Sequence, residues 1–166
     1  MIIFGISIGT MNTGVCVLQD GHLLDRHIHK FSTSWSEAKF RIIMKRYRQY
    51  LQKYSITAIV IKVPPVHKHT KAIARILKGI EALAKEYYCE FDLFTKSELK
   101  SITCMRSTDE LIEYTKRLYP GLATLHKKGT ANRHSYYKKM FEAILSAHVY
   151  QERQIVRAVQ LERSRE

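Results

Sequence analysis

The sequence predicts an α/β protein built on one mixed five-stranded sheet with helices on both faces. The chain opens with an apolar, Ile-rich segment followed by two more strand segments, and two later strand segments alternate with amphipathic stretches, in the order βββ-α-β-α-β-α-α. Consecutive strands joined by short turns form an antiparallel meander, whereas a strand reached through a crossover helix returns parallel to its predecessor. A chain of 166 residues is long enough for one domain with one sizeable core.

The three leading strands are expected at 1–8, 14–21 and 22–31. A tight turn at 9–14 separates the first two strands. Asp20-Gly21 is a strong hairpin signal between the second strand and the third. These segments therefore form the meander.

Each later element has its own start or stop signal. Ser34 or Ser36 caps a helix, a second helix begins near Thr70, and Pro64-Pro65 ends the strand between them. In chain order, we expect a helix at 36–54, a strand at 57–65, a helix after 70, a strand at 89–94, a capped single turn at 95–102, a helix at 108–119, a basic loop at 122–134 and a last helix from 135 to about 151.

The domain organisation predicted from these elements is simple. Residues 1–151 form the α/β domain, and no linker or internal repeat divides them. Residues 152–166 alternate in charge and either extend the last helix or fray.

The charge balance indicates a polyanionic partner. Lys and Arg number 28 against 15 Asp and Glu, which gives a net charge of +13 and a pI near 9.8. Nucleic acid is the first candidate and an anionic membrane surface the second, and the alternative is a charged surface selected for solubility.

Several absences in the sequence favour a cytoplasmic protein with no membrane partner. No apolar run approaches the ~18 residues that span a bilayer, and the N-terminus lacks the pattern of a signal peptide. Cys16, Cys89 and Cys104 are widely spaced, without the spacing of a metal site, so we expect reduced thiols.

Three segments carry a resemblance to a known family: "GISIGTMNTGVCVLQDG", "AIVIKVPP" and "YYKKMFEAILSAHVY". In this order they resemble the RuvC-type Holliday junction resolvases of the ribonuclease H-like superfamily. The residues of the first segment that match are Gly9, Thr10, Asn12, Thr13 and Gly14. The resemblance implies a ribonuclease H-like fold over residues 1–151. It also implies two Mg²⁺ ions held by about four converging carboxylates.

Three of those four carboxylates are missing. The positions that correspond to the family's acids hold Ser7, Lys62, Lys139 and Glu142, and only Glu142 is acidic. Because a site with two cationic side chains repels Mg²⁺, we expect no metal, no cofactor and no nuclease activity by this mechanism. The alternative is an active Mg²⁺-dependent endonuclease with relocated acids, for which Asp20, Asp25, Asp92, Asp109 and Glu110 are the nearby candidates.

The altered site has three interpretations. In the first, Lys62 and Lys139 replace the metals and hold a nucleic-acid phosphate without cutting it. Its plainer alternative is a structural ion pair between Lys62 and Glu142. In the second, Ser7 and Lys62 form a nucleophile pair. In the third, the protein has a structural or assembly role, and the resemblance leaves a homodimer open.

We expect a nucleic-acid partner, with DNA favoured over RNA. The residues predicted to bind it are Thr10, Asn12, Thr13, Lys62, Lys68, Lys71, Arg75, Lys127, Lys128, Arg133, Lys138 and Lys139. Contacts from such basic segments are to phosphates, so the affinity depends strongly on salt.

Overall fold

The computed structural model describes residues 1–125 and 131–166, with backbone alone for 124 and 131–136. Its sheet has five strands in the order β3-β2-β1-β4-β5. The strands are β1 (Ile2–Ser7), β2 (Asn12–Gln19), β3 (His22–Lys30), β4 (Ala58–Val63) and β5 (Glu90–Thr95). β1, β2 and β3 pair antiparallel, and β4 pairs parallel with both β1 and β5. The predicted mixed sheet is confirmed.

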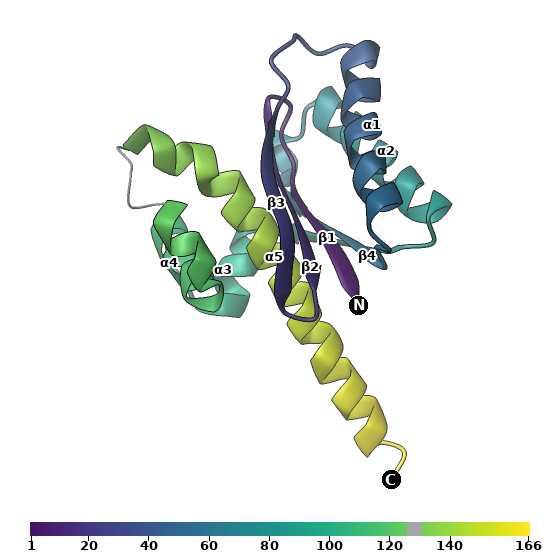
Figure 1. The fold of residues 1–166 in the computed structure, drawn as a ribbon, viewed down its shortest axis with the longest axis vertical. Coiled ribbons are helices and arrows are strands. Elements are labelled where there is room, and N and C mark those ends of the chain that lie inside the picture. Colours follow the sequence, from purple (N-terminus) through teal and green to yellow (C-terminus); the bar gives the residue numbers. More distant parts are fainter. Residues whose placement is uncertain (126–130) are drawn as a thin grey trace.

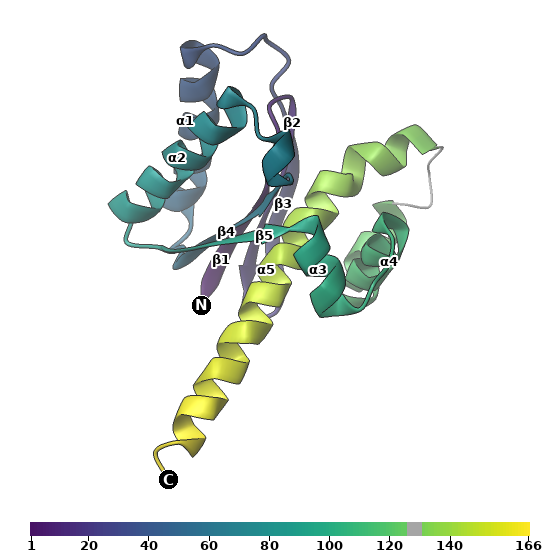
Figure 2. The same ribbon diagram turned by 180° about the vertical axis from the view of Figure 1, so that it is seen from behind.

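Helices cover both faces of this sheet (Figure 1). The first face carries α1 (Glu37–Lys53) and α2 (Lys71–Glu86). On the second face α5 (Ala131–Arg163) packs on β1 and β2, and α3 (Lys96–Thr103) and α4 (Thr108–Leu118) lie beside it (Figure 2). Short 3₁₀ segments occur at Val66–Lys68 and Pro120–Leu125. No helix within the described ranges has the length and apolar character that crossing a bilayer requires.

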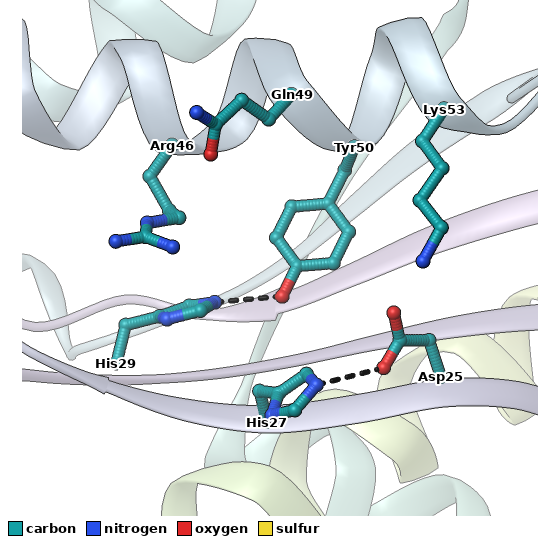
Figure 3. Close-up of a pocket in the computed structure, with 7 residues that line it drawn as sticks. All are labelled: Asp25, His27, His29, Arg46, Gln49, Tyr50 and Lys53. Atoms are coloured by element: carbon teal, nitrogen blue, oxygen red, sulfur yellow. Dashed lines mark hydrogen bonds and ion pairs between the residues drawn. The ribbon is translucent and has the colours of Figure 1, made fainter.

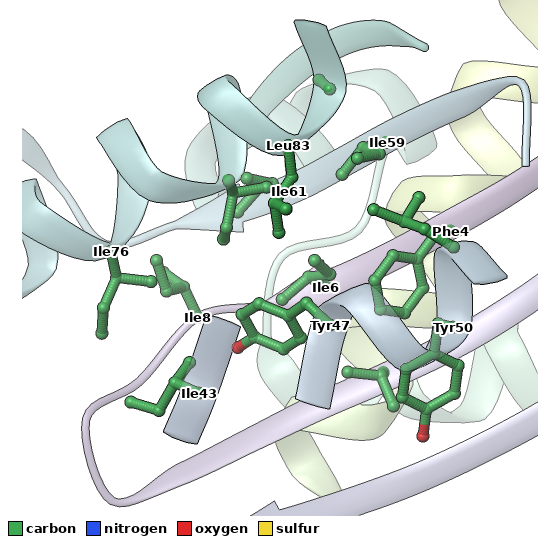
Figure 4. Close-up of a cluster of buried hydrophobic side chains, with 14 of the residues drawn as sticks. Phe4, Ile6, Ile8, Ile43, Tyr47, Tyr50, Ile59, Ile61, Ile76 and Leu83 are labelled. Atoms are coloured by element: carbon green, nitrogen blue, oxygen red, sulfur yellow. The ribbon is translucent and has the colours of Figure 1, made fainter. Parts of the chain in front are cut away.

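The sheet separates two hydrophobic cores. Alternate residues of each strand point to opposite faces, so Phe4 and Ile6 pack under α1 and α2, whereas Ile3 packs under α5. In the first core the Phe4 ring stacks on Tyr50 at a centroid distance of 4.8 Å (Figure 4). The α1–α2 layer and the α5 layer therefore each bury one face of the sheet.

The helix starts follow the local capping signals. The hydroxyls of Ser36, Thr70 and Ser107 each accept a hydrogen bond from the backbone amide three residues later. Thr95 and Glu98 form a reciprocal capping box, and the predicted single turn there is an eight-residue helix, α3.

The last helix is longer than the sequence pattern predicts. It begins at Ala131, four residues before the expected start at Ser135, and runs unbroken to Arg163. The expected basic loop is thus replaced by helix from residue 131 onward, and residues 126–130 lie outside the described part of the chain. The charged character of 131–134 suggested a loop, but no Gly or Pro interrupts the helix there or in the tail.

Two glycines let α5 approach the sheet closely. A Cβ atom on Gly14 would overlap the carbonyl carbon of Lys139. One on Gly5 would lie 2.5 Å from the carbonyl oxygen of Ala143. Because neither backbone can retreat without moving the helix, these glycines set the height of α5 above β1 and β2.

We predict that Gly14→Ala destabilises the fold by about 3 kcal/mol, because overpacking here is against backbone and not against a flexible side chain. Urea denaturation measures the change in the free energy of unfolding. Gly121→Ala is the matched control, since a Cβ atom added there would meet no described atom within 4 Å. Equal stability of the two variants would show that α5 is not held at this distance by Gly14.

Candidate nucleic-acid site over the first and fourth strands

Three of the residues singled out by the sequence meet under α5. The parallel register of β1 and β4 places Ser7 beside Lys62. Glu142 approaches both from α5: Lys62 Nζ lies 2.6 Å from Glu142 Oε2, and Ser7 Oγ donates to the same oxygen at 3.3 Å. Glu142 is only 4% exposed and Ser7 is fully buried. The site is therefore a buried ion pair with a hydroxyl donor.

Two further lysines lie around this pair. Lys139, one turn before Glu142 on α5, donates from Nζ to the backbone oxygen of Ile8 at 3.0 Å. Lys96, the first residue of α3, has its Nζ 3.8 Å from Glu142 Oε1. Lys96 was not among the residues predicted from the sequence. The signal for it was its position directly after β5, because parallel strands bring their carboxyl ends to one edge of the sheet.

The pKa values reflect crowding of cations around one carboxylate. Burial alone would raise the pKa of the Glu142 carboxyl, but the nearby ammonium groups, Lys62 first, lower it below its ordinary value. Burial and the neighbouring Lys62 lower the pKa of Lys139. Burial, opposed by Glu142 and reinforced by Lys138 and Lys62, lowers the pKa of Lys96 to about 8. The site thus holds an ionised carboxylate within a surplus of positive charge.

The residues present do not fit a Mg²⁺ centre. Mg²⁺ takes hard oxygen ligands, mainly carboxylates and water. Here the Glu142 carboxylate is bound by the Lys62 ammonium, and Ser7 contributes only a neutral hydroxyl. Across the described residues, no group of three or more His, Cys, Asp or Glu side chains is arranged to hold a metal ion.

The candidate relocated acids lie elsewhere. Asp20 pairs with the N-terminal ammonium, and Asp25 accepts from Tyr54 on the α1 side of the sheet. Asp92 accepts from the amide of Leu93, and Asp109 and Glu110 lie in the first turn of α4.

Ser7 is not arranged as a nucleophile. Its hydroxyl donates to Glu142, and its side chain is fully buried. A Ser–Lys pair requires the hydroxyl to face both the lysine and the substrate. The geometry gives the nucleophile interpretation no support.

The turn after β1 is held by an internal hydrogen bond. Thr13 is fully buried and its Oγ1 donates to the carbonyl of Gly9 at 3.0 Å. Thr10 is half-buried and Asn12 is exposed. Of the three turn residues predicted to bind nucleic acid, Thr10 and Asn12 are therefore the two that solvent can reach.

The predicted basic residues fall into three groups. Lys68 and Lys71 are exposed after β4, near the carboxyl edge of the sheet, and Lys138 is half-buried beside Lys139. Arg75 is already engaged, since it pairs with Glu37 at 3.3 Å and its guanidinium lies 3.7 Å from the centroid of the Phe40 ring. The residues whose side chains lie outside the described part of the structure are Lys127, Lys128 and Arg133.

Comparison with solved structures defines the class of fold. A sheet of this order with α5 crossing β1 and β2 is the ribonuclease H-like fold of the RuvC type. The chain is similar to Thermus thermophilus RuvC in complex with a Holliday junction substrate, with a TM-score of 0.70, 15% identity, and coverage of 93% of this chain and 96% of that one. A second T. thermophilus RuvC structure gives a TM-score of 0.69 with the same identity and coverage. No family model and no curated protein matches the sequence.

We predict that Lys62→Met lowers the free energy of unfolding by about 3 kcal/mol, because it leaves the Glu142 carboxylate buried without its closest cation. The double variant Lys62→Met/Glu142→Gln should recover most of the loss, since it removes both charges. Urea denaturation at neutral pH measures both. A double variant as unstable as the single one would show that packing of the lysine stem, and not charge pairing, is what matters.

The cost of Lys62→Met should depend on pH. In the native protein the pKa of Glu142 is below its ordinary value of 4.5, so its stabilising contribution is present above pH 4.5 and is lost as the pH falls through the folded-state value. Without Lys62, burial raises the carboxyl pKa. The difference in unfolding free energy between the two proteins should therefore shrink from about pH 7 to about pH 4, and a constant difference would contradict this assignment.

Proposed function

We propose that this protein binds structured or duplex nucleic acid on the α5 face without Mg²⁺ and without cutting the strand. The observation that carries the proposal is the Lys62–Glu142 ion pair at 2.6 Å, which stands at the positions where the resemblance expects a cluster of acids. A metal-dependent nuclease needs that cluster to be acidic, whereas phosphate binding needs it to be cationic.

The surplus charge supports a phosphate ligand. Glu142 neutralises one of the three ammonium groups at Lys62, Lys96 and Lys139. Lys62 is the one most tightly paired, so its main role in the proposal is to hold the carboxylate. Lys96 and Lys139 then supply the net positive charge. Lysine serves as a point charge toward phosphate and does not require a fixed geometry.

The charge of the whole chain and its structural likeness agree with a nucleic-acid partner. The net charge of +13 favours association with a polyanion. The T. thermophilus RuvC with which this chain shares its fold is bound to a Holliday junction in one of its structures. We propose DNA over RNA on this ground.

Fluorescence anisotropy with a labelled four-way junction, a duplex and a single strand tests the proposal. We expect binding that weakens steeply with salt and is the same in Mg²⁺ and in EDTA, with intact DNA on a denaturing gel. An RNA duplex of the same sequence serves as the comparison for DNA preference. Mg²⁺-dependent cleavage would overturn the proposal, as would the absence of binding at low salt.

Lys96 should make this binding dependent on pH. Its pKa of about 8 means that it loses its charge as the pH rises from about 7 to about 9. The affinity of the native protein should fall by about fivefold over that range, whereas Lys96→Arg should keep its affinity because arginine stays charged. Lys100→Arg on the same helix is the control, and its nucleic-acid affinity should fall with pH as that of the native protein does.

Removal of the charge gives a second readout at this position. Lys96→Ala should reduce the slope of log affinity against log salt by about one, the value for one lost phosphate contact. An unchanged slope would place Lys96 outside the interface.

A further inference from the structure

A cleft lined by polar and charged residues lies on the opposite face of the sheet, between α1 and the edge strand β3 (Figure 3). Its volume is about 340 Å³. The residues that line it are Asp25, His27, His29, Arg46, Gln49, Tyr50 and Lys53. The cleft shares no residue with the Lys62–Glu142 site, and the sheet separates the two.

The β3 wall of the cleft is held together by internal hydrogen bonds. Asp25, His27 and His29 alternate along the strand and therefore face the same side. Asp25 accepts from Tyr54 at 2.9 Å and lies 3.1 Å from His27 Nε2, while His29 Nε2 lies 2.7 Å from Tyr50 Oη. Among the described residues that line the cleft, Asp25 is the one carboxylate. It is therefore already engaged with Tyr54 and His27.

The α1 wall presents donors that are not committed to acids. Arg46, Gln49 and Lys53 follow one another at helical spacing along the side of α1 that faces β3. Within the described chain, neither Arg46 nor Lys53 lies within ion-pair distance of a carboxylate. Lys53 Nζ instead lies 5.0 Å from the centroid of the Tyr54 ring.

We propose that this cleft binds a phosphate group, either of a small phosphate ester or of a nucleic-acid backbone. The Arg46 guanidinium matches phosphate through two parallel hydrogen bonds, and the Lys53 ammonium and the Gln49 amide add donors. His27, whose side chain is 60% exposed, lies on the β3 side of the cleft, where its ring is close enough to report on a bound phosphate. A cleft of this volume accommodates a phosphate together with its ester group.

A metal ion is a poorer occupant. Asp25, His27 and His29 share a face of β3, but Asp25 and His29 are engaged in the contacts with Tyr54 and Tyr50. The three also do not converge on a point, since no metal-binding group of three such residues occurs in the described chain. Two uncommitted cations on the facing helix repel a metal and attract an anion.

His29 supplies a spectroscopic readout inside the cleft. Burial first, and then the charge of Arg46, lower the pKa of His29 to about 4. An anion beside Arg46 offsets the effect of that charge. Phosphate binding should therefore raise the pKa of His29 and move the side-chain resonances of both His27 and His29.

Histidine side-chain NMR during titration with inorganic phosphate tests the proposal on the full chain. We expect saturable shifts of His27 and His29, assigned with His27→Gln and His29→Gln, while the other histidines move little. Arg46→Ala/Lys53→Ala should weaken the apparent affinity by about tenfold or more. Arg41→Ala/Lys45→Ala removes the same charge from exposed positions of α1 outside the cleft and should leave the affinity unchanged.

Two outcomes would overturn the proposal: no saturable shift of His27 or His29, or equal weakening by both double variants, which would indicate non-specific attraction. Titration with adenosine monophosphate and with a DNA duplex separates the two phosphate sources. If the cleft binds a nucleic-acid backbone, the duplex should produce the same shifts. If it binds a small phosphate ester, only adenosine monophosphate should produce them. The outcome of the phosphate titration does not depend on the proposed function. Lys96→Ala should weaken duplex binding on the α5 face and leave the phosphate-induced shifts of His27 and His29 intact.

Discussion

The buried contact between Lys62 and Glu142 is the interaction on which the arrangement of the α5 face depends. Removing both charges from water costs several kcal/mol, and only a short, well-oriented contact offsets that cost. The contact exists because β4 pairs in register with β1 and because α5 lies close to the sheet. Gly5 and Gly14 permit that close approach. The paired strands, the two glycines and the lysine therefore act as a single unit.

The same scaffold positions can favour opposite ligands according to the sign of their charge. A cluster of carboxylates repels a phosphate until metal ions are bound between them. A lysine at one of those positions supplies positive charge directly and removes the need for the metal, but it also removes the metal-activated water that cleaves the strand. At Lys62 the ammonium is bound to the remaining acid. Glu142 Oε2 contacts the Lys62 ammonium and accepts from the Ser7 hydroxyl.

Most of the fold could be predicted because its signals are local. The caps at Ser36, Thr70 and Ser107 are set within four residues. The strands β1, β2 and β4 follow from apolar runs rich in Ile and Val. The meeting of Lys62 with Glu142 could be predicted only through the family resemblance, which supplies the register of α5 on the sheet. The position of Lys96 directly after β5 was a signal for it, but its contact with Glu142 could not be predicted, because that contact depends on where α3 packs against α5. Likewise, nothing local to Arg75 showed that Glu37, 38 residues away in sequence, occupies its guanidinium.

The two faces of the sheet differ in the chemistry of their cations. Around Glu142 the described cations are lysines, which attract a phosphate as point charges and tolerate many orientations of the strand. Such a surface suits a ligand that is long and repetitive, since any phosphate along it satisfies the charge. Between α1 and β3 the cations are one arginine and one lysine, set in a cleft with a neutral His29 and an amide. The guanidinium fork demands a fixed orientation of the phosphate oxygens. The proposed ligand of the α5 face is accordingly a polymer, and that proposed for the α1 cleft is a single phosphate group with a fixed orientation.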